Sequence, residues 1–275
     1  MEQPQQQQLR NTENFYEMNK DRFTSTIFLY KNTKVRYLLP KAYEESKKKY
    51  QGDIETALKA NKDFFGSIPT SFTISFLDNT EDFQYFAPKK QKGDYINGYA
   101  RGTRITMFLP SAYETETTFH PADYEDPEAA KTARFQNTLA HEIAHCTTDH
   151  IVWKKNKGLP PWANEAIAQQ LETHQIVRKA SEEKNKKIRD YIVSHYSTFP
   201  TDEQLRTDQI YSPLKYSFGK LFYAFLRNKT GLTNNVFTQD VLNQFRDYGE
   251  DFLSFLSHYF KKPSEEMYQE FLQGL

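Results

Sequence analysis

The chain has 275 residues, enough for one large domain or two small domains around a sizeable core. Lys and Arg together number 36, as do Asp and Glu, so the net charge is zero and nucleic acid is not an expected partner. A single Cys excludes a disulfide framework and a cysteine-based zinc knuckle. No apolar run approaches the roughly 18 residues that a membrane-spanning helix needs, so no membrane partner is expected either.

The first part of the chain combines a polar tail with a sheet-forming segment. Residues 1–22 are polar and rich in Gln, which predicts a disordered tail. The tail lacks the apolar core of a signal peptide, which favours a cytoplasmic protein. Residues 23–158 are expected to form the N-terminal subdomain. The sequence predicts strands over 23–30 and 71–77, and between them a helix over 41–65 that is interrupted near Gly52.

A further strand and a loop are expected between residue 97 and residue 126. Residues 97–109 read as one strand with a glycine-rich start, and Pro110 ends it. The loop that follows, 110–126, contains Tyr113, His120 and Tyr124 and is expected to flank the active site.

The next predicted helix contains the motif His-Glu-x-x-His at residues 141–145. Asp126 and Pro127 supply an N-cap and a first-turn proline, and residues 128–149 contain no Gly or Pro. Residues four apart lie on one face of a helix, so His141 and His145 can direct two imidazoles at one ion. Glu142 lies beside them as a base for a water molecule, which completes the minimum set for activating water on zinc.

A zinc site needs a third protein ligand, and several residues qualify. Asp149, His150 and His174 are candidates, but the first two follow on the same helix and cannot easily wrap a tetrahedral site. His174 is expected to lie deep in another helix. The better candidate is Glu165, because the Pro pair at 160–161 begins a new helix and places this carboxylate in its first turn. Cys146, beside the motif, is expected to be a small buried apolar residue.

The order of these residues resembles the gluzincin metallopeptidases. His-Glu-x-x-His is followed by Trp162-x-Asn164-Glu165-x-x-Ala168, and the resemblance implies that Glu165 is the third zinc ligand. Nineteen residues separate His145 from Glu165, whereas the aminopeptidase branch usually has eighteen; a loop absorbs one extra residue easily. Ala166 stands where the family usually has Gly. The resemblance implies an α+β, zincin-like fold, with a small sheet-bearing subdomain packed on the active-site helix.

Two further segments extend the resemblance. Tyr216 and Gly219 form a Tyr-x-x-Gly segment, and the resemblance implies that the Tyr216 phenol donates a hydrogen bond to the tetrahedral intermediate. A gluzincin also places a strand beside the zinc, which implies that Gly98, Tyr99 and Ala100 contact the substrate backbone. Because the chain has 18 Tyr, a structural role for Tyr216 is the alternative. For the segment 97–109, the alternative to substrate contact is an ordinary sheet strand with a turn.

Two departures from the family pattern bear on function. The aminopeptidase branch carries a Glu in the strand beside the zinc, but none occurs between residues 97 and 109, which favours an endopeptidase. Thermolysin-like relatives have an acidic residue four positions after the ligand Glu, where it supports a zinc-bound His. Here that position is Gln169, a weaker acceptor for the imidazole.

The sequence as a whole predicts a zinc-dependent peptidase. His141, His145 and Glu165 are expected to hold one Zn²⁺ per chain, with Glu142 as general base and a peptide or protein as substrate. Residues 159–275 are expected to form an all-helical C-terminal subdomain. Two alternatives stay open: an inactive gluzincin-like module that binds a protein, and a helical scaffold whose His pair is incidental. The intact Glu142 favours the enzyme.

Overall fold

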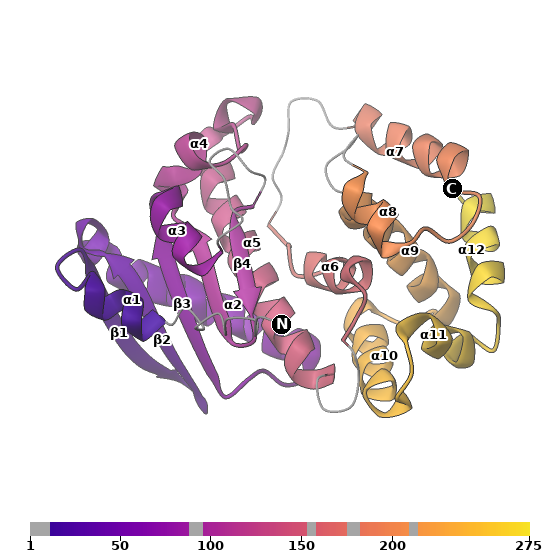
Figure 1. Ribbon diagram of the computed structural model, residues 1–275, viewed down its shortest axis with the longest axis horizontal. Helices are drawn as coiled ribbons and strands as arrows, with labels where there is room; N and C mark the ends of the chain where they lie inside the picture. The colour runs from indigo at the N-terminus through magenta and orange to yellow at the C-terminus, as the bar shows by residue number, and fades with distance from the viewer. Residues whose placement is uncertain (1–11, 88–95, 153–157, 175–181, 209–213) are drawn as a thin grey trace, which may run out of the picture.

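The computed structural model describes residues 12–87, 96–152, 158–174, 182–208 and 214–275. Its α+β fold has two halves that lie side by side, and the chain passes from one to the other between α5 and α6 (Figure 1). The first half contains a small mixed sheet with helices, and the described part of the second half is helical, as the sequence predicts. The elements of the first half are α1 (Thr12–Met18), β1 (Phe23–Tyr30), β2 (Thr33–Pro40), η1 (Lys41–Ser46), α2 (Lys47–Phe65), β3 (Ser71–Leu77), α3 (Thr80–Phe86), β4 (Gly98–Arg101), β5 (Arg104–Phe108), η2 (Pro110–Ala112), α4 (Tyr113–Glu116), η3 (Pro121–Asp123) and α5 (Pro127–Val152). Those of the second half are α6 (Pro161–Gln169), α7 (Glu182–His195), α8 (Asp202–Thr207), α9 (Leu214–Thr230), α10 (Asn234–Tyr248), α11 (Phe252–Phe260) and α12 (Ser264–Gln273).

The sheet has the strand order β1-β2-β3-β5-β4. β2, β3 and β5 run parallel, while β1 and β4 pair antiparallel at the two edges. The sequence analysis predicted β1, β3 and β5 but not β2. The signal for β2 is the alternation of buried Val35 and Tyr37 with the charged residues Lys34 and Arg36.

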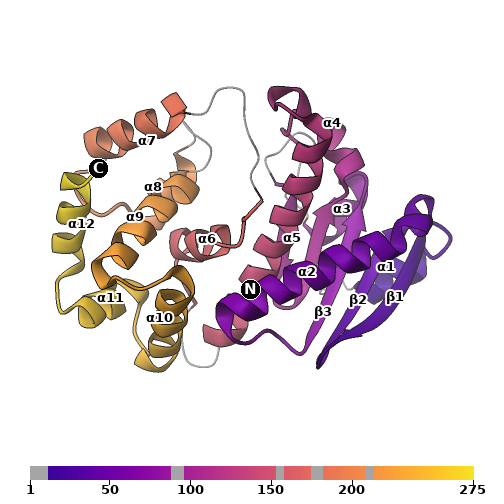
Figure 2. The same ribbon diagram turned by 180° about the vertical axis from the view of Figure 1, so that it is seen from behind.

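Helices α2 and α5 cover one face of this sheet, as the view from behind shows (Figure 2). Aromatic side chains fill the layer between them. Phe76 of β3 contacts Tyr50 of α2 and Phe135 of α5, with ring centroids 5.4 and 5.5 Å apart. The long helix that carries the His-Glu-x-x-His motif therefore rests on a rigid aromatic core.

The segment 97–109 is a hairpin and not the single predicted strand. β4 pairs antiparallel with β5, with Gly98 opposite Met107 and Arg101 opposite Arg104. Gly102 turns the chain with a φ of 63°, a left-handed conformation that favours glycine. The two glycines that the sequence analysis read as the start of one strand therefore belong to β4 and to the turn after it.

Two other predictions for the first half are wrong in part. The helix predicted over 41–65 is interrupted at residue 46, where η1 gives way to α2, and α2 continues through Gly52. Residues 12–18 of the predicted disordered tail form α1, whose Phe15 is 2% exposed and contacts the Phe23 ring. An aromatic anchor thus orders this part of a polar segment. Residues 1–11 of the predicted tail lie outside the described residues.

The helical half is built around Trp162 at the start of α6. This indole is 1% exposed and contacts four phenylalanine rings from separate parts of the half: Phe199, Phe218, Phe222 and Phe252. α6 is therefore fixed by its second residue, three positions before Glu165. None of the helices in the described ranges combines the length and apolar composition needed to cross a bilayer.

Candidate metal centre and active site

The two histidines of the motif lie in the central part of α5, where the helix is held on both sides. The Asp126 carboxylate accepts a hydrogen bond from Ala129 N at 3.0 Å, so the predicted N-cap is confirmed. From α2, the Asn61 amide donates to the Ala140 carbonyl at 3.0 Å. On the other side, the Asn137 side chain bonds both the carbonyl and the amide of His174, at 2.9 and 3.0 Å. The helix is thus anchored directly beside His141.

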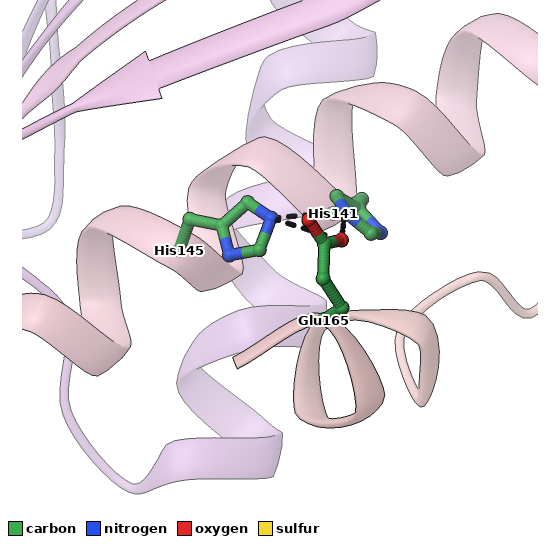
Figure 3. A group of neighbouring side chains, drawn as sticks. All are labelled: His141, His145 and Glu165. Carbon is green, nitrogen blue, oxygen red and sulfur yellow. Dashed lines mark hydrogen bonds and ion pairs between the residues drawn. The ribbon is translucent and has the colours of Figure 1, made fainter. Parts of the chain in front are cut away.

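Three side chains converge from two helices (Figure 3). His141 Nε2 lies 3.0 Å from His145 Nε2 and 3.2 Å from Glu165 Oε2, and His145 Nε2 lies 3.6 Å from the same oxygen. Ligands at about 2.0–2.1 Å from a tetrahedral zinc are separated by about 3.3–3.4 Å, so these three atoms have the spacing of three corners of a zinc tetrahedron. His141, His145 and Glu165 therefore form a group that fits a metal ion.

The pKa values of His141 and Glu165 also favour a cation bound between these side chains. Burial disfavours the charged imidazole of His141, but hydrogen bonds to Glu165 and Glu172 outweigh this and raise its pKa to about 10. Burial likewise opposes the charged form of Glu165, yet hydrogen bonds to both histidines hold its pKa well below the usual range. Two anionic carboxylates thus face one imidazole, and a divalent cation can replace the proton they stabilise.

Glu172 supports His141 from behind and was missed by the sequence analysis. Its Oε1 lies 2.7 Å from His141 Nδ1, although its side chain is still 32% exposed. Gln169, the position the family pattern assigns to this role, instead donates to the Tyr216 carbonyl at 3.4 Å. Because α6 ends at Gln169, the chain turns back and Glu172 reaches the imidazole from beyond the helix. Among the described residues, the buried Nδ1 of His145 has no hydrogen-bond partner, so only His141 has a carboxylate behind its ring.

Glu142 lies against the edge strand β4. A Cβ added to Gly98 would lie only 2.7 Å from both Cγ and Oε1 of Glu142, so the carboxylate occupies the space a side chain would take. Burial raises the pKa of Glu142, while the charges of His145 and His141 oppose the rise. The outer side of β4 pairs with no further strand among the described residues. Gly98, Tyr99 and Ala100 therefore lie on an open edge beside the motif.

Tyr216 lies in the first turn of α9 and is close to the same carboxylates. Burial raises the pKa of its phenol, and the negative charges of Glu165 and Glu142 raise it further, so the hydroxyl keeps its proton. Gly219, which follows three residues later on α9, allows this helix to pack closely against α6. A Cβ at residue 219 would lie 2.3 Å from the Trp162 carbonyl oxygen and 3.3 Å from the Ala166 Cβ. The glycine thus permits the close approach of α9 to α6 at Ala166.

Lys215 is a second residue that the sequence analysis missed. Its Nζ donates to Glu165 Oε1 at 2.8 Å and lies 4.6 Å from the centroid of the Tyr216 ring. Because Lys215 holds Oε1, the other oxygen of Glu165 is the one that faces the two imidazoles. This arrangement leaves Glu165 ready to bind a metal through a single oxygen. The sequence signal that could have identified Lys215 is its position as a cationic residue directly before the Tyr-x-x-Gly segment.

The alternative third ligands do not join the group. Among the described residues, the only set of three His, Cys, Asp or Glu side chains with metal-binding spacing is His141, His145 and Glu165. His174 follows α6 in a non-helical segment, contrary to the prediction of a helix there. Cys146 is 1% exposed, and burial raises the pKa of its thiol, so the prediction of a small buried residue is confirmed.

Comparison with known proteins supports the fold and adds little at the level of sequence. No protein-family model matches the chain, and no curated protein matches its sequence. Among solved structures, it resembles an aminopeptidase N family protein from Idiomarina loihiensis with a TM-score of 0.51 and 13% sequence identity. The match covers 91% of this chain but 46% of that one, so the chain spans less than half of its structural neighbour. The likeness shows a shared fold.

Proposed function

We propose that the protein is a zinc-dependent peptidase of the gluzincin type. The observation that carries this proposal is the convergence of His141, His145 and Glu165 at tetrahedral spacing. The proposed general base, Glu142, follows His141 on α5 and lies against Gly98 of β4, a strand that forms an edge of the sheet among the described residues. The fold likeness to an aminopeptidase N family protein supports the same class of enzyme.

The residues of the chain have separate roles in the proposed reaction. Zinc held by His141, His145 and Glu165 would act as a Lewis acid and lower the pKa of water toward about 7. Glu142 takes the proton of the attacking water and passes it to the leaving amine. Tyr216, which remains protonated, donates a hydrogen bond to the developing oxyanion.

The substrate is proposed to be a peptide that adds to the sheet as a strand beside β4. Gly98, Tyr99 and Ala100 then contact its backbone through the unpaired edge of the strand. No Glu occurs between residues 97 and 109 to hold a free amino terminus, which favours an endopeptidase over an aminopeptidase. We retain the expectation that neither nucleic acid nor a membrane is a partner and that the protein is cytoplasmic.

The test is the variant Glu142→Gln, compared with wild type on an unbiased peptide library. The variant keeps all three metal ligands, so it should bind one zinc per chain and still lose hydrolysis by about 10²-fold or more. Metal analysis and library cleavage measure the two results separately. A zinc-loaded wild type that cleaves no peptide would contradict the proposal and favour the inactive protein-binding module.

A further inference from the structure

Arg134 is a cation close to the site that the proposed mechanism does not use. It lies on α5 seven residues before His141, which is nearly two full turns and therefore the same face of the helix. The residue is partly buried. Its Nε atom is buried without a hydrogen-bond partner, and no ion pair of the described residues involves its guanidinium.

The charge of Arg134 nevertheless acts on the site. It lowers the pKa of Glu172, which supports His141, and it opposes the rise in the pKa of Tyr216. These effects agree with the position of Arg134 on the face of α5 that also bears His141. By contrast, Lys131 on the previous turn of α5 is neutralised by Glu114 and Glu128 at 2.7 and 2.9 Å.

We infer that Arg134 binds a carboxylate of the peptide substrate, and this inference rests on the proposed peptidase function. A buried N–H without a hydrogen-bond partner is costly, and among the described residues the Nε of Arg134 has none, so a bound carboxylate would relieve that cost. Its planar fork matches a carboxylate through two parallel hydrogen bonds.

The helix geometry sets how far the carboxylate lies from the scissile bond. Seven residues of α-helix correspond to about 10 Å along the axis, and an extended peptide advances about 3.3–3.6 Å per residue. The carboxylate therefore lies within about three residues of the scissile bond. It belongs either to an Asp or Glu side chain or to the carboxyl terminus of a short peptide.

Binding measured in the Glu142→Gln background tests the inference without relying on turnover. Three otherwise identical peptides are compared: one with Glu near the scissile bond, one with Gln at that position, and one with Gln and a carboxyl-terminal amide. We expect the zinc-loaded Glu142→Gln protein to bind a carboxylate peptide at least about tenfold more tightly than its uncharged counterpart. The pair that shows the difference identifies the source of the carboxylate.

The additional change Arg134→Gln should reduce this preference to about one, while affinity for the uncharged peptide and zinc content stay unchanged. Lys131→Gln is the matched control, since it removes a cation that is already paired. If Arg134→Gln alters zinc affinity or thermal stability but leaves the preference intact, Arg134 only balances Glu172 and the inference is wrong.

Hydrolysis by wild type without any carboxylate preference overturns the inference alone. Carboxylate-selective binding without hydrolysis in wild type overturns the peptidase function alone, and absence of peptide binding overturns both.

Discussion

At the scale of single residues, three neighbouring residues position the side chains of the site. Gly98 gives the Glu142 carboxylate its space beside β4. Glu172 holds the ring of His141 from its far side. Lys215 fixes one oxygen of Glu165. Each of these three contacts orients a residue that the proposed reaction needs, although none of them touches the water or the scissile bond.

The substitution Gly98→Ala should displace the general base without removing the metal. The new Cβ would lie 2.7 Å from Glu142 Cγ, and the flexible carboxylate arm must move away. We expect kcat/KM to fall by about 10²-fold, within the range for loss of a general base, with zinc content unchanged. Steady-state kinetics and metal analysis check both. Gly52→Ala is the matched control, because a Cβ there meets nothing within 4 Å; equal activity of both variants would contradict this role of Gly98.

The substitution Glu172→Ala should weaken zinc binding. It removes the carboxylate that orients His141, a kind of change that typically lowers metal affinity by about 10–100-fold. A competition titration with a zinc chelator measures the effect. Gln169→Ala, at the position the family pattern favours, should leave zinc affinity close to that of wild type. If the two variants behave alike, Glu172 does not support the metal site.

At the scale of elements, the site is formed where α5, α6 and α9 meet. α5 supplies both histidines and Glu142, the proposed base, α6 supplies Glu165, and α9 supplies Tyr216. The motifs on α5 and α6 could be predicted from sequence because helix spacing and a Pro pair fix their local geometry. Glu172 could not, because the end of α6 and the return of the chain toward His141 depend on tertiary packing. The turn at Gly102 corresponds to the alternative interpretation of 97–109, a sheet strand with a turn, because glycine is the residue that such a turn favours.

The substitution Gly219→Ala should disturb the packing of α9 on α6. Its Cβ would lie 2.3 Å from the Trp162 carbonyl oxygen, and this backbone atom has little freedom to move. We expect the free energy of unfolding to fall by about 1–3 kcal/mol, a typical cost of overpacking. We also expect kcat to fall, since Tyr216 and Glu165 lie at this contact. Denaturant unfolding and kinetics measure the two effects, and a variant with wild-type stability and kcat would show that the close approach is not needed.

At the scale of the whole molecule, the site joins the two halves of the fold. The histidines belong to the helix that rests on the sheet, and Glu165 belongs to the helix that Trp162 fixes in the helical half (Figure 1). The division into a sheet-bearing and a helical half follows from strand alternation and helical periodicity, which a sequence displays directly. How the halves approach each other depends on contacts such as those of Asn137 on α5 with the backbone of His174, which no local pattern encodes.

The most direct test of the central claim is the zinc stoichiometry of the purified protein after equilibration with the metal. We predict one zinc per wild-type chain, and its loss in His141→Ala, His145→Ala and Glu165→Ala. His150→Ala, on the last turn of the same helix, should retain the full zinc content. A wild type that takes up no zinc, or ligand variants that keep it, would contradict the assignment of these three residues as a metal centre.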